Sequence, residues 1–232
     1  MKTLDLPRVE KLLEERVPGA RCILRPITHL QAPLLPEERL AAALLTPPKK
    51  AEFVAGRTAA RMAMKKLGHP PRGIPKKESG EPLWPHGLVG SISHTKDLCL
   101  CVMGETQRFR SIGIDIENIR RMKKEIAHRV LTSSEKESLS NLPPPLFLQH
   151  ATILFSAKEA YFKFYFSLTG RPARFHEFSF RLHPDKKRLV QLHPAPSSPV
   201  FNGIYEVLKE WVVVTVWEES VGDGCNNLLR NR

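Results

Sequence analysis

The sequence lacks the patterns that would place it in several large classes of protein. Its 232 residues contain no run of about 18 consecutive apolar residues, so we expect no membrane-spanning helix. The first residues, MKTLDLPRVEKLLEERV, carry acidic side chains early and no continuous apolar segment, which does not fit a secretory signal. We therefore expect a cytoplasmic protein.

Cysteine is scarce, and its spacing does not fit a metal centre. The four cysteines include no C-x-x-C pair and no alternation of cysteine with histidine, so a zinc site is not expected. Cys99 and Cys101 lie two residues apart in LCLCV, where a strand would point both side chains the same way, into a core. Reduced thiols of this kind agree with a cytoplasmic location.

Two motifs that bind phosphate or build a serine nucleophile are also missing. The sequence has no glycine-rich loop of the P-loop or dinucleotide-binding type and no G-x-S-x-G segment. Any phosphate must therefore be held by side chains and metal. Positive charge is abundant instead, with 36 Lys and Arg against 24 Asp and Glu and a net charge of +12. This excess indicates a nucleic acid, a phosphorylated small molecule or an acidic protein as partner, or only a solvated basic surface.

The pattern of apolar residues predicts an α+β fold. With 41% hydrophobic and 26% charged residues, the composition is that of a globular protein. Each half gives helices followed by a small group of strands, with a joint near residue 110. We therefore predict two α/β subdomains of similar size, 1–110 and 111–220, and a flexible tail at 221–232.

The individual elements follow from periodicity, capping residues and proline or glycine breaks. Helices are expected at 4–17, 36–45, 47–68, 122–142 and 150–170, the fourth broken at TSSEKE, where Ser133 or Ser134 could cap a new helix. Strands are expected at 88–95, 98–104, 111–117, 175–182, 188–193 and within 201–219. The segments 69–87 and 142–147 are expected to be a loop and a linker.

The segment SIGIDIE places two acids on one face of a strand. Ile112, Ile114 and Ile116 would share one face, and Asp115 and Glu117 the other. Two carboxylates about 6–7 Å apart along a strand can reach one hard cation, and Mg²⁺ prefers oxygen ligands together with substrate phosphates. Taken alone, a D-x-E pair is more often an exposed strand face than a metal site.

The helix FSAKEAYFKF adds a third carboxylate. Glu159 and Lys163 are four residues apart and share a helix face, as a surface ion pair also would. The helix is aromatic on most sides, however, so it should be buried, and its charges then need partners. Glu159 beside Asp115 and Glu117, with Lys163 close by, would form a metal site and a phosphate clamp together.

Hydroxyls and cations are gathered in two further segments. GSISHT carries Ser93 and His94, which as strand neighbours point opposite ways and cannot form a catalytic dyad. They could belong to a phosphate site, or the histidine could be structural. The helix GRTAARMAMKK carries Arg57 and Arg61 on one face, and these are either phosphate ligands or part of a solvated basic helix. Further lysines flank this helix or lie in the loop after it: Lys49, Lys50, Lys76 and Lys77.

The ordered segments GSISHT, GIDIE and FSAKEAYFK resemble the 4′-phosphopantetheinyl transferases of the siderophore- and surfactin-synthetase-activating branch. Upstream, PPKKAEFVAGRTAAR and GEPLWPHGLVGSISHT are similar to the enterobactin-synthase-component type. The resemblance covers residues from about Leu35 to Phe180. It implies a cytoplasmic, monomeric enzyme with two α/β subdomains related by a pseudo-twofold axis, and an active site in the cleft between them.

The resemblance also implies an activity. Such enzymes are holo-acyl-carrier-protein synthases in the broad sense. They transfer 4′-phosphopantetheine from coenzyme A to a serine of an apo acyl or peptidyl carrier protein and release adenosine 3′,5′-bisphosphate. The carriers are acidic and serve polyketide, non-ribosomal peptide, siderophore or fatty-acid synthesis. Neither a nucleic acid nor a membrane is then expected as a partner.

Residue roles carry over where the motifs match. Asp115, Glu117 and Glu159 would bind Mg²⁺, with Mn²⁺ as an alternative. Glu159 would also serve as the base for the carrier serine or orient that base, and Lys163 would neutralise the transferring phosphate. With Asp115, these two form the implied catalytic set. The implied coenzyme A ligands are Lys49, Arg57, Lys76, Ser93, His94, Lys158 and Lys163.

Two positions depart from the pattern of the resembling enzymes. Lys49 stands where the enterobactin type commonly has arginine, so its contact with phosphate could be looser. Asn118 stands where the surfactin type often has lysine, a role that Arg120 could take over.

Two other classes of protein compete with this interpretation. A metal-dependent nuclease also combines clustered carboxylates with a lysine and a basic surface, but it usually carries E-x-K on a strand and not K-E-x-x-x-K on a helix. A nucleic-acid-binding protein without catalytic activity would explain the positive charge but not the strand with two acids.

Overall fold

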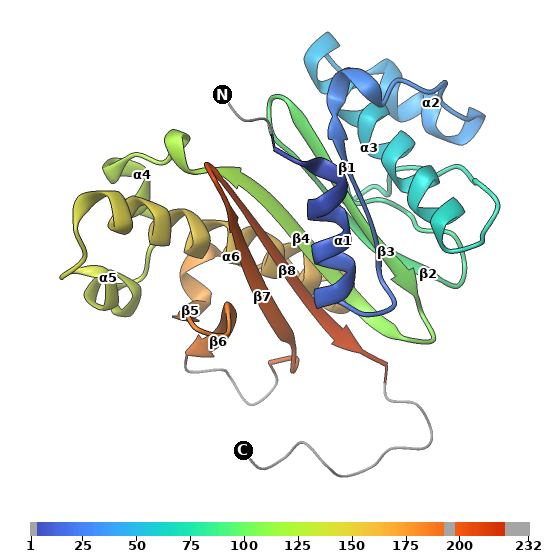
Figure 1. The fold of residues 1–232 in the computed structure, drawn as a ribbon. Helices are drawn as coiled ribbons and strands as arrows, with labels where there is room; N and C mark the ends of the chain where they lie inside the picture. Colours follow the sequence, from blue (N-terminus) through green and yellow to red (C-terminus); the bar gives the residue numbers. More distant parts are fainter. Residues whose placement is uncertain (1–3, 193–197, 221–232) are drawn as a thin grey trace.

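The computed structural model describes residues 4–192 and 198–220, and it is a mixed α/β fold with two antiparallel sheets (Figure 1). The smaller sheet has the strand order β1-β3-β2 and the larger one the order β4-β8-β7-β6-β5. The tail 221–232, with Cys225, lies outside the described residues. The strands are β1 (Arg21–Pro26), β2 (Leu88–His94), β3 (Leu98–Glu105), β4 (Phe109–Asn118), β5 (Ser179–His183), β6 (Arg188–Leu192), β7 (Asn202–Leu208) and β8 (Trp211–Glu219).

The helices of the first half lie where the sequence predicts them. They are α1 (Leu6–Arg16), α2 (Pro36–Ala43) and α3 (Pro47–Lys66), with a short 3₁₀ turn at Ile27–His29. Alanines along α3 pack against one face of the small sheet, where Cys99 and Cys101 are buried as predicted. Gly68 follows α3 with φ of 84°, a left-handed conformation that glycine adopts without strain and that ends a helix.

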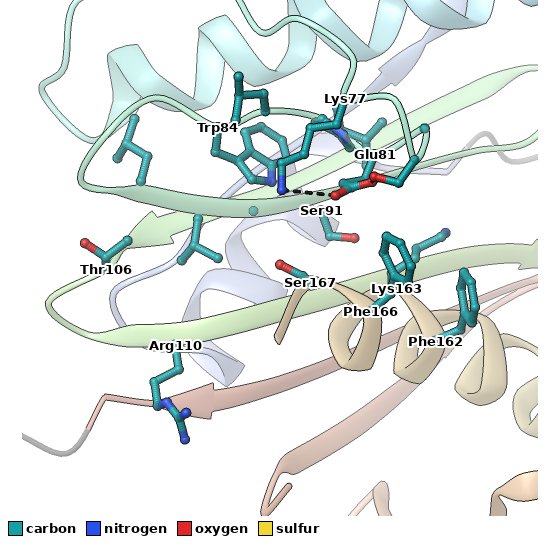
Figure 2. A pocket seen from close by; sticks show the side chains of 18 of the residues that line it. Lys77, Glu81, Trp84, Ser91, Thr106, Arg110, Phe162, Lys163, Phe166 and Ser167 are labelled. Atoms are coloured by element: carbon teal, nitrogen blue, oxygen red, sulfur yellow. Dashed lines mark hydrogen bonds and ion pairs between the residues drawn. The ribbon is translucent and has the colours of Figure 1, made fainter. Parts of the chain in front are cut away.

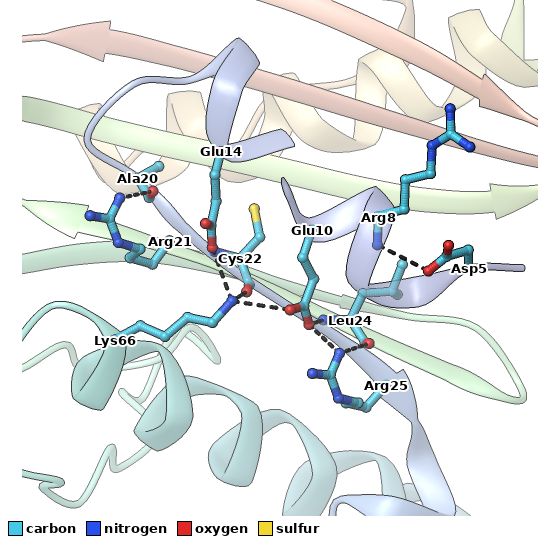
Figure 3. A network of polar contacts seen from close by, with 10 residues as sticks. All are labelled: Asp5, Arg8, Glu10, Glu14, Ala20, Arg21, Cys22, Leu24, Arg25 and Lys66. Atoms are coloured by element: carbon cyan, nitrogen blue, oxygen red, sulfur yellow. Dashed lines mark hydrogen bonds and ion pairs between the residues drawn. The ribbon is translucent and has the colours of Figure 1, made fainter. Parts of the chain in front are cut away.

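Strand β1 is not predicted from the sequence, in which residues 18–35 carry no expected element. Its outer edge is closed by a helix and not by another strand. The carboxylates of Glu10 and Glu14 accept hydrogen bonds from the N–H groups of Leu24 (2.7 Å) and Cys22 (2.9 Å), and Lys66 donates to both acids at 3.0 and 3.1 Å (Figure 3). Glu10 and Glu14 are four residues apart on the helix, and Cys22 and Leu24 are two residues apart on the strand. Both separations correspond to about 6–7 Å, so each acid reaches one N–H group.

The second half differs from the prediction at two helix starts. Its helices are α4 (Lys124–Val130), α5 (Ser133–Leu139) and α6 (Pro144–Thr169), with 3₁₀ turns at Ile119–Arg121 and Phe175–Glu177. Thr132, and not Ser133 or Ser134, caps α5, because its hydroxyl accepts from the Glu135 N–H while the Glu135 carboxylate accepts from the Thr132 N–H.

The expected linker at 142–147 is also wrong, because α6 begins inside it. Pro144 and Pro145 occupy the first turn of the helix, where no intrahelical N–H donor is required and the fixed φ of proline suits the helix. Gly170 ends α6 in a left-handed conformation, as predicted.

One of the apolar clusters among the described residues joins the two halves. Side chains of α1 pack with one face of β3 and with Ile112, Ile114 and Ile116 of β4, while α6 covers the other face of the large sheet (Figure 1). The joint predicted at residue 110 falls in the first residues of β4, and this core contains side chains from both sides of it. Among the described residues, no helix is both long and apolar enough to cross a membrane.

Candidate active site

Strand β4 is buried on both faces, and this burial positions its acids. Ile112, Ile114 and Ile116 point into the shared core, as the alternation predicts. On the other face Gly113 lies against α6, where an added Cβ would come within 2.0 Å of the Ala160 carbonyl oxygen. Only glycine allows this approach, which brings α6 onto the side of β4 that carries Asp115.

Asp115 is 3% exposed, and its two oxygens have different surroundings. Oδ1 accepts hydrogen bonds from the Ser93 hydroxyl at 2.8 Å and from the Lys163 ammonium at 2.9 Å. Lys163 donates as well to the Ile114 carbonyl oxygen at 3.0 Å. Oδ2 is buried and has no hydrogen-bond partner. One oxygen is therefore fully engaged, and the other is available.

Three carboxylates from two distant segments influence one another here, as the sequence predicts. Burial, followed by the charges of Asp115 and Glu159, raises the pKa of Glu117 to about 7. Burial and the charge of Asp115 also raise the pKa of Glu159. Lys163 opposes both shifts without cancelling them. The cluster therefore has more negative charge than its surroundings compensate.

The cluster is not a ready-made ligand cage. Within 4–192 and 198–220, no three side chains of His, Cys, Asp or Glu are arranged to hold a metal ion. The donor set nevertheless fits a hard cation, because it consists of carboxylate oxygens, one of them buried and without a partner, at a point of uncompensated negative charge. The residues predicted to bind Mg²⁺ thus suit it chemically.

Four of the predicted coenzyme ligands line one cavity of about 290 Å³. Lys49, Arg57, Lys76 and His94 come to it from α3, the loop that follows α3, and the end of β2. Arg57 is held in place by its Nε donating to the Ile74 carbonyl oxygen at 2.6 Å and by its guanidinium lying 4.3 Å from the centre of the Phe53 ring. Burial lowers the pKa of Arg57 to about 10, so the guanidinium stays charged at neutral pH.

The same cavity contains an acid that the sequence analysis missed. Glu52 accepts from Lys49 at 2.8 Å, and its carboxylate lies 3.6 Å from the Nε2 of His94. Burial lowers the pKa of His94, although the charge of Glu52 acts in the opposite direction. The i,i+3 spacing of Lys49 and Glu52 on one helix was the signal that could have found this acid.

Two basic residues from the sequence analysis lie outside this set. Arg61, which shares a helix face with Arg57, binds both carboxylate oxygens of the buried Glu38, at 2.8 and 2.7 Å. Arg120 pairs with Glu210 at 2.8 Å on the surface. Both contacts explain these arginines in structural terms.

Ser93 and His94 point to opposite faces of β2, as neighbouring residues of a strand must. His94 lines the cationic cavity, whereas the Ser93 hydroxyl faces β4 and donates to Asp115. The contact between the Ser93 side chain and phosphate that the resemblance implies is thus not supported by its orientation.

Lys158 is engaged inside the second half. Its ammonium lies 3.0 Å from the Glu135 carboxylate and donates to the carbonyl oxygens of Phe175 and Phe178 at 2.7 and 2.6 Å. Lys158 is 1% exposed and Glu135 0%. Three acceptors satisfy the three protons of the ammonium, so the contact with phosphate that the resemblance implies for Lys158 has no free donor.

A larger pocket of about 670 Å³ opens between the two halves (Figure 2). Trp84 and Ser91 line it from the first half, and Phe162, Lys163 and Phe166 line it from α6. Its walls are mainly apolar. Lys163, whose ammonium is paired with Asp115, is the charged residue of α6 that lines it. Trp84, Phe162 and Phe166 are not among the site residues predicted from the sequence, because aromatic residues in helices and loops are usually part of a core.

Comparisons with known proteins identify the family of the chain. Residues 28–104 match the family model of the 4′-phosphopantetheinyl transferase N-terminal domain, and residues 111–216 match that of the 4′-phosphopantetheinyl transferase superfamily. The chain belongs to this superfamily. The family that the sequence motifs resemble is thereby confirmed.

Similar proteins include two 4′-phosphopantetheinyl transferases and an enterobactin synthase component D. The 4′-phosphopantetheinyl transferase Npt of Nocardia iowensis is 37% identical over 129 residues, 56% of this chain and 57% of Npt. PptT of Mycobacterium tuberculosis is 36% identical over 137 residues, 59% of this chain and 60% of PptT. Enterobactin synthase component D of Salmonella typhimurium is 42% identical over 120 residues, 50% of this chain and 47% of that protein. The match thus spans about half to three-fifths of each relative.

Among solved structures, a holo-(acyl-carrier-protein) synthase from Bacillus anthracis in complex with CoA is 22% identical. The similarity covers 49% of this chain and 99% of that one, with a TM-score of 0.40.

Proposed function

We propose that this protein transfers 4′-phosphopantetheine from coenzyme A to a serine hydroxyl of an apo carrier protein and releases adenosine 3′,5′-bisphosphate. The observation that carries the proposal is the convergence of Asp115, Glu117 and Glu159 with Lys163 beside the pocket between the halves, in a chain of the transferase superfamily. A nuclease would need no such apolar pocket beside its carboxylates, and a simple nucleic-acid-binding protein would need no carboxylate cluster.

Coenzyme A would occupy both cavities. The cations of the smaller cavity, Lys49, Arg57, Lys76 and His94, suit the phosphate on the nucleotide, and the apolar pocket beside Trp84 and Phe162 suits the pantetheine arm. The pyrophosphate would then lie next to Lys163 and the carboxylates. In this arrangement the cleft between two subdomains related by pseudo-twofold symmetry is the active site.

The residues near the pyrophosphate would bind the cation, neutralise charge and accept a proton. Asp115, Glu117 and Glu159 would hold Mg²⁺ or Mn²⁺, and the cation would neutralise charge on the diphosphate oxygens. Lys163, whose ammonium donates to Oδ1 of Asp115, would neutralise charge on the transferring phosphoryl group. Glu159 would in addition accept the proton of the carrier serine as that hydroxyl attacks phosphorus and adenosine 3′,5′-bisphosphate leaves.

The net charge of +12 suits an acidic carrier protein, because opposite charges speed encounter. In this proposal the enzyme works as a cytoplasmic monomer on carriers of polyketide, non-ribosomal peptide, siderophore or fatty-acid synthesis. Enterobactin synthase component D among the relatives favours a siderophore-related carrier.

Intact-mass spectrometry tests the proposal. Apo carriers from each of the four kinds of pathway are incubated with the protein, coenzyme A and Mg²⁺. We expect at least one carrier to gain the mass of one phosphopantetheinyl group on its serine. A carrier variant with Ala in place of that serine is the control and should stay unmodified. If no carrier in the panel gained mass, the proposed activity would be wrong.

A further inference from the structure

The two serines of GSISHT lie between the two sheets. Ser91 and Ser93 are two residues apart on β2, so both side chains point to the same face, and both are 5% exposed. That face meets β4 of the other sheet. Within the described part of the chain, β2 pairs with β3 and β4 pairs with β8, so no strand pairing there connects β2 to β4. The serine hydroxyls make the hydrogen bonds that join the two strands at this junction.

Each serine contacts a different group of β4. The Ser91 hydroxyl accepts a hydrogen bond from the Ile114 N–H at 3.1 Å, and the Ser93 hydroxyl donates to Asp115 Oδ1 at 2.8 Å. Lys163 completes the arrangement from α6, since it donates to the Ile114 carbonyl oxygen and to the same Oδ1. Both the backbone at Ile114 and one oxygen of Asp115 are thus fixed by side chains from outside the sheet.

The arrangement distinguishes the two oxygens of Asp115. Two donors occupy Oδ1, one from each half of the protein, whereas the buried Oδ2 has no partner. A buried carboxylate oxygen without a partner is costly, so a site that leaves one in place indicates a ligand for it. Partners of this kind around a metal-binding carboxylate fix its orientation.

We propose that Ser91 and Ser93 are positioning residues that hold β4 against β2 so that Asp115 presents Oδ2 to the cation. This inference deepens the proposed function and depends on it. Ser91 fixes the backbone on which Asp115 is carried, and Ser93 fixes the carboxylate itself. Because His94 lies on the opposite face of β2, the same strand also ties the cationic cavity to the carboxylate cluster.

Metal binding and nucleotide binding, measured separately, test this role. Mn²⁺ affinity is measured by electron paramagnetic resonance of free Mn²⁺ with saturating coenzyme A. Affinity for adenosine 3′,5′-bisphosphate is measured by calorimetry in EDTA. For Ser93→Ala we expect Mn²⁺ binding to weaken about 10-fold or more, by the usual effect of such partners, while nucleotide affinity in EDTA stays unchanged. Ser93→Thr keeps the hydroxyl and should restore Mn²⁺ binding. Ser140→Ala, at an exposed serine directly after α5, is the matched control.

Ser91→Ala is tested by hydrogen exchange as well. Loss of the acceptor should speed exchange of the Ile114 amide and weaken Mn²⁺ binding, and neither change is expected in Ser140→Ala. Unchanged Mn²⁺ affinity in a folded Ser93→Ala would overturn the inference. So would a loss of nucleotide affinity in EDTA, which would make Ser93 a phosphate ligand. A parent protein that bound neither coenzyme A nor Mn²⁺ would instead refute the proposed function, and the inference with it.

Discussion

The ammonium of Lys163 lies 2.9 Å from Oδ1 of Asp115 and 3.0 Å from the carbonyl oxygen of the preceding residue, Ile114. Helix α6 and strand β4 are therefore locked together at the point where the carboxylates converge. Gly113 makes this possible, because any larger residue would push α6 away from the strand. The lysine thus has two tasks, one in positioning Asp115 and one in supplying positive charge beside the pocket.

Replacement of Lys163 by Met should lower carrier modification about 100-fold or more, because such a preorganised charge contributes about that much to phosphoryl transfer. The measurement is kcat/KM with a saturating concentration of the second substrate. Lys65→Met, an exposed lysine at the end of α3, is the control and should retain the parent rate. Near-parental turnover in a folded Lys163→Met protein would remove this residue from the mechanism.

The carboxylate cluster should make stability depend on pH in a particular direction. The pKa of Glu117 is raised to about 7 in the folded protein, so between about pH 4.5 and 7 the folded state binds more protons than the unfolded state. Stability of the metal-free protein must then fall as the pH rises through this range. After discounting for the partial exposure of Glu117, we expect a loss of about 2 kcal/mol in the free energy of unfolding.

Urea denaturation in EDTA between pH 5 and pH 8 measures this loss. Glu117→Gln should flatten the profile and make the protein more stable than the parent at pH 8. Mg²⁺ with coenzyme A should raise the melting temperature more at pH 8 than at pH 5.5, because the cation replaces the protons. A parent profile that rose with pH from 5 to 7, with Glu117→Gln no different from it, would contradict the electrostatic account.

Binding of adenosine 3′,5′-bisphosphate should depend on the protonation of His94. Burial lowers the pKa of this histidine, so it is mainly neutral at pH 8 and gains charge as the pH falls. Calorimetry should therefore find tighter binding at pH 6 than at pH 8. His94→Ala should weaken binding at pH 6 and lose much of this pH dependence. An exposed histidine, His29, offers the control His29→Ala, and equal pH dependence in both variants would exclude His94 from the site.

Lys158 should act on stability and not on nucleotide binding. Its loss leaves the Glu135 carboxylate buried without its counter-charge, which typically costs about 3–5 kcal/mol. Lys158→Met should therefore unfold at much lower urea concentration, and the double variant Lys158→Met/Glu135→Gln should recover part of the loss. The folded fraction should bind adenosine 3′,5′-bisphosphate as the parent does. Weaker binding without loss of stability would restore the role of Lys158 as a phosphate ligand.

Much of the site could be predicted from the sequence because its residues occur in local patterns. Alternation along SIGIDIE placed Asp115 and Glu117 on one face, and helical spacing paired Glu159 with Lys163. Strand alternation also separated His94 from Ser93. What Ser93 contacts could not be predicted, because its partner, Asp115, lies 22 residues away on another sheet. The buried ion pair of Lys158 with Glu135 likewise depends on how α5 packs against α6.

The secondary structure was less predictable where the same local sequence pattern is compatible with two different structures. The prolines at 143–145 break a helix in most contexts, but here they begin one. Strand β1 was missed because its outer edge is satisfied by Glu10 and Glu14 of a helix, and no turn signal leads to a partner strand. One error concerns where a helix begins and the other how a helix packs on a strand, and neither affects the residues of the carboxylate cluster.

The most direct test of the central claim is the mass of one responsive apo carrier after incubation with coenzyme A, in Mg²⁺ and in EDTA. We predict a gain of one phosphopantetheinyl group in Mg²⁺, with an equal amount of adenosine 3′,5′-bisphosphate released, and no gain in EDTA. The Asp115→Asn variant should give no detectable gain in either buffer on the same timescale. Undiminished modification by Asp115→Asn, or by the parent in EDTA, would contradict the account.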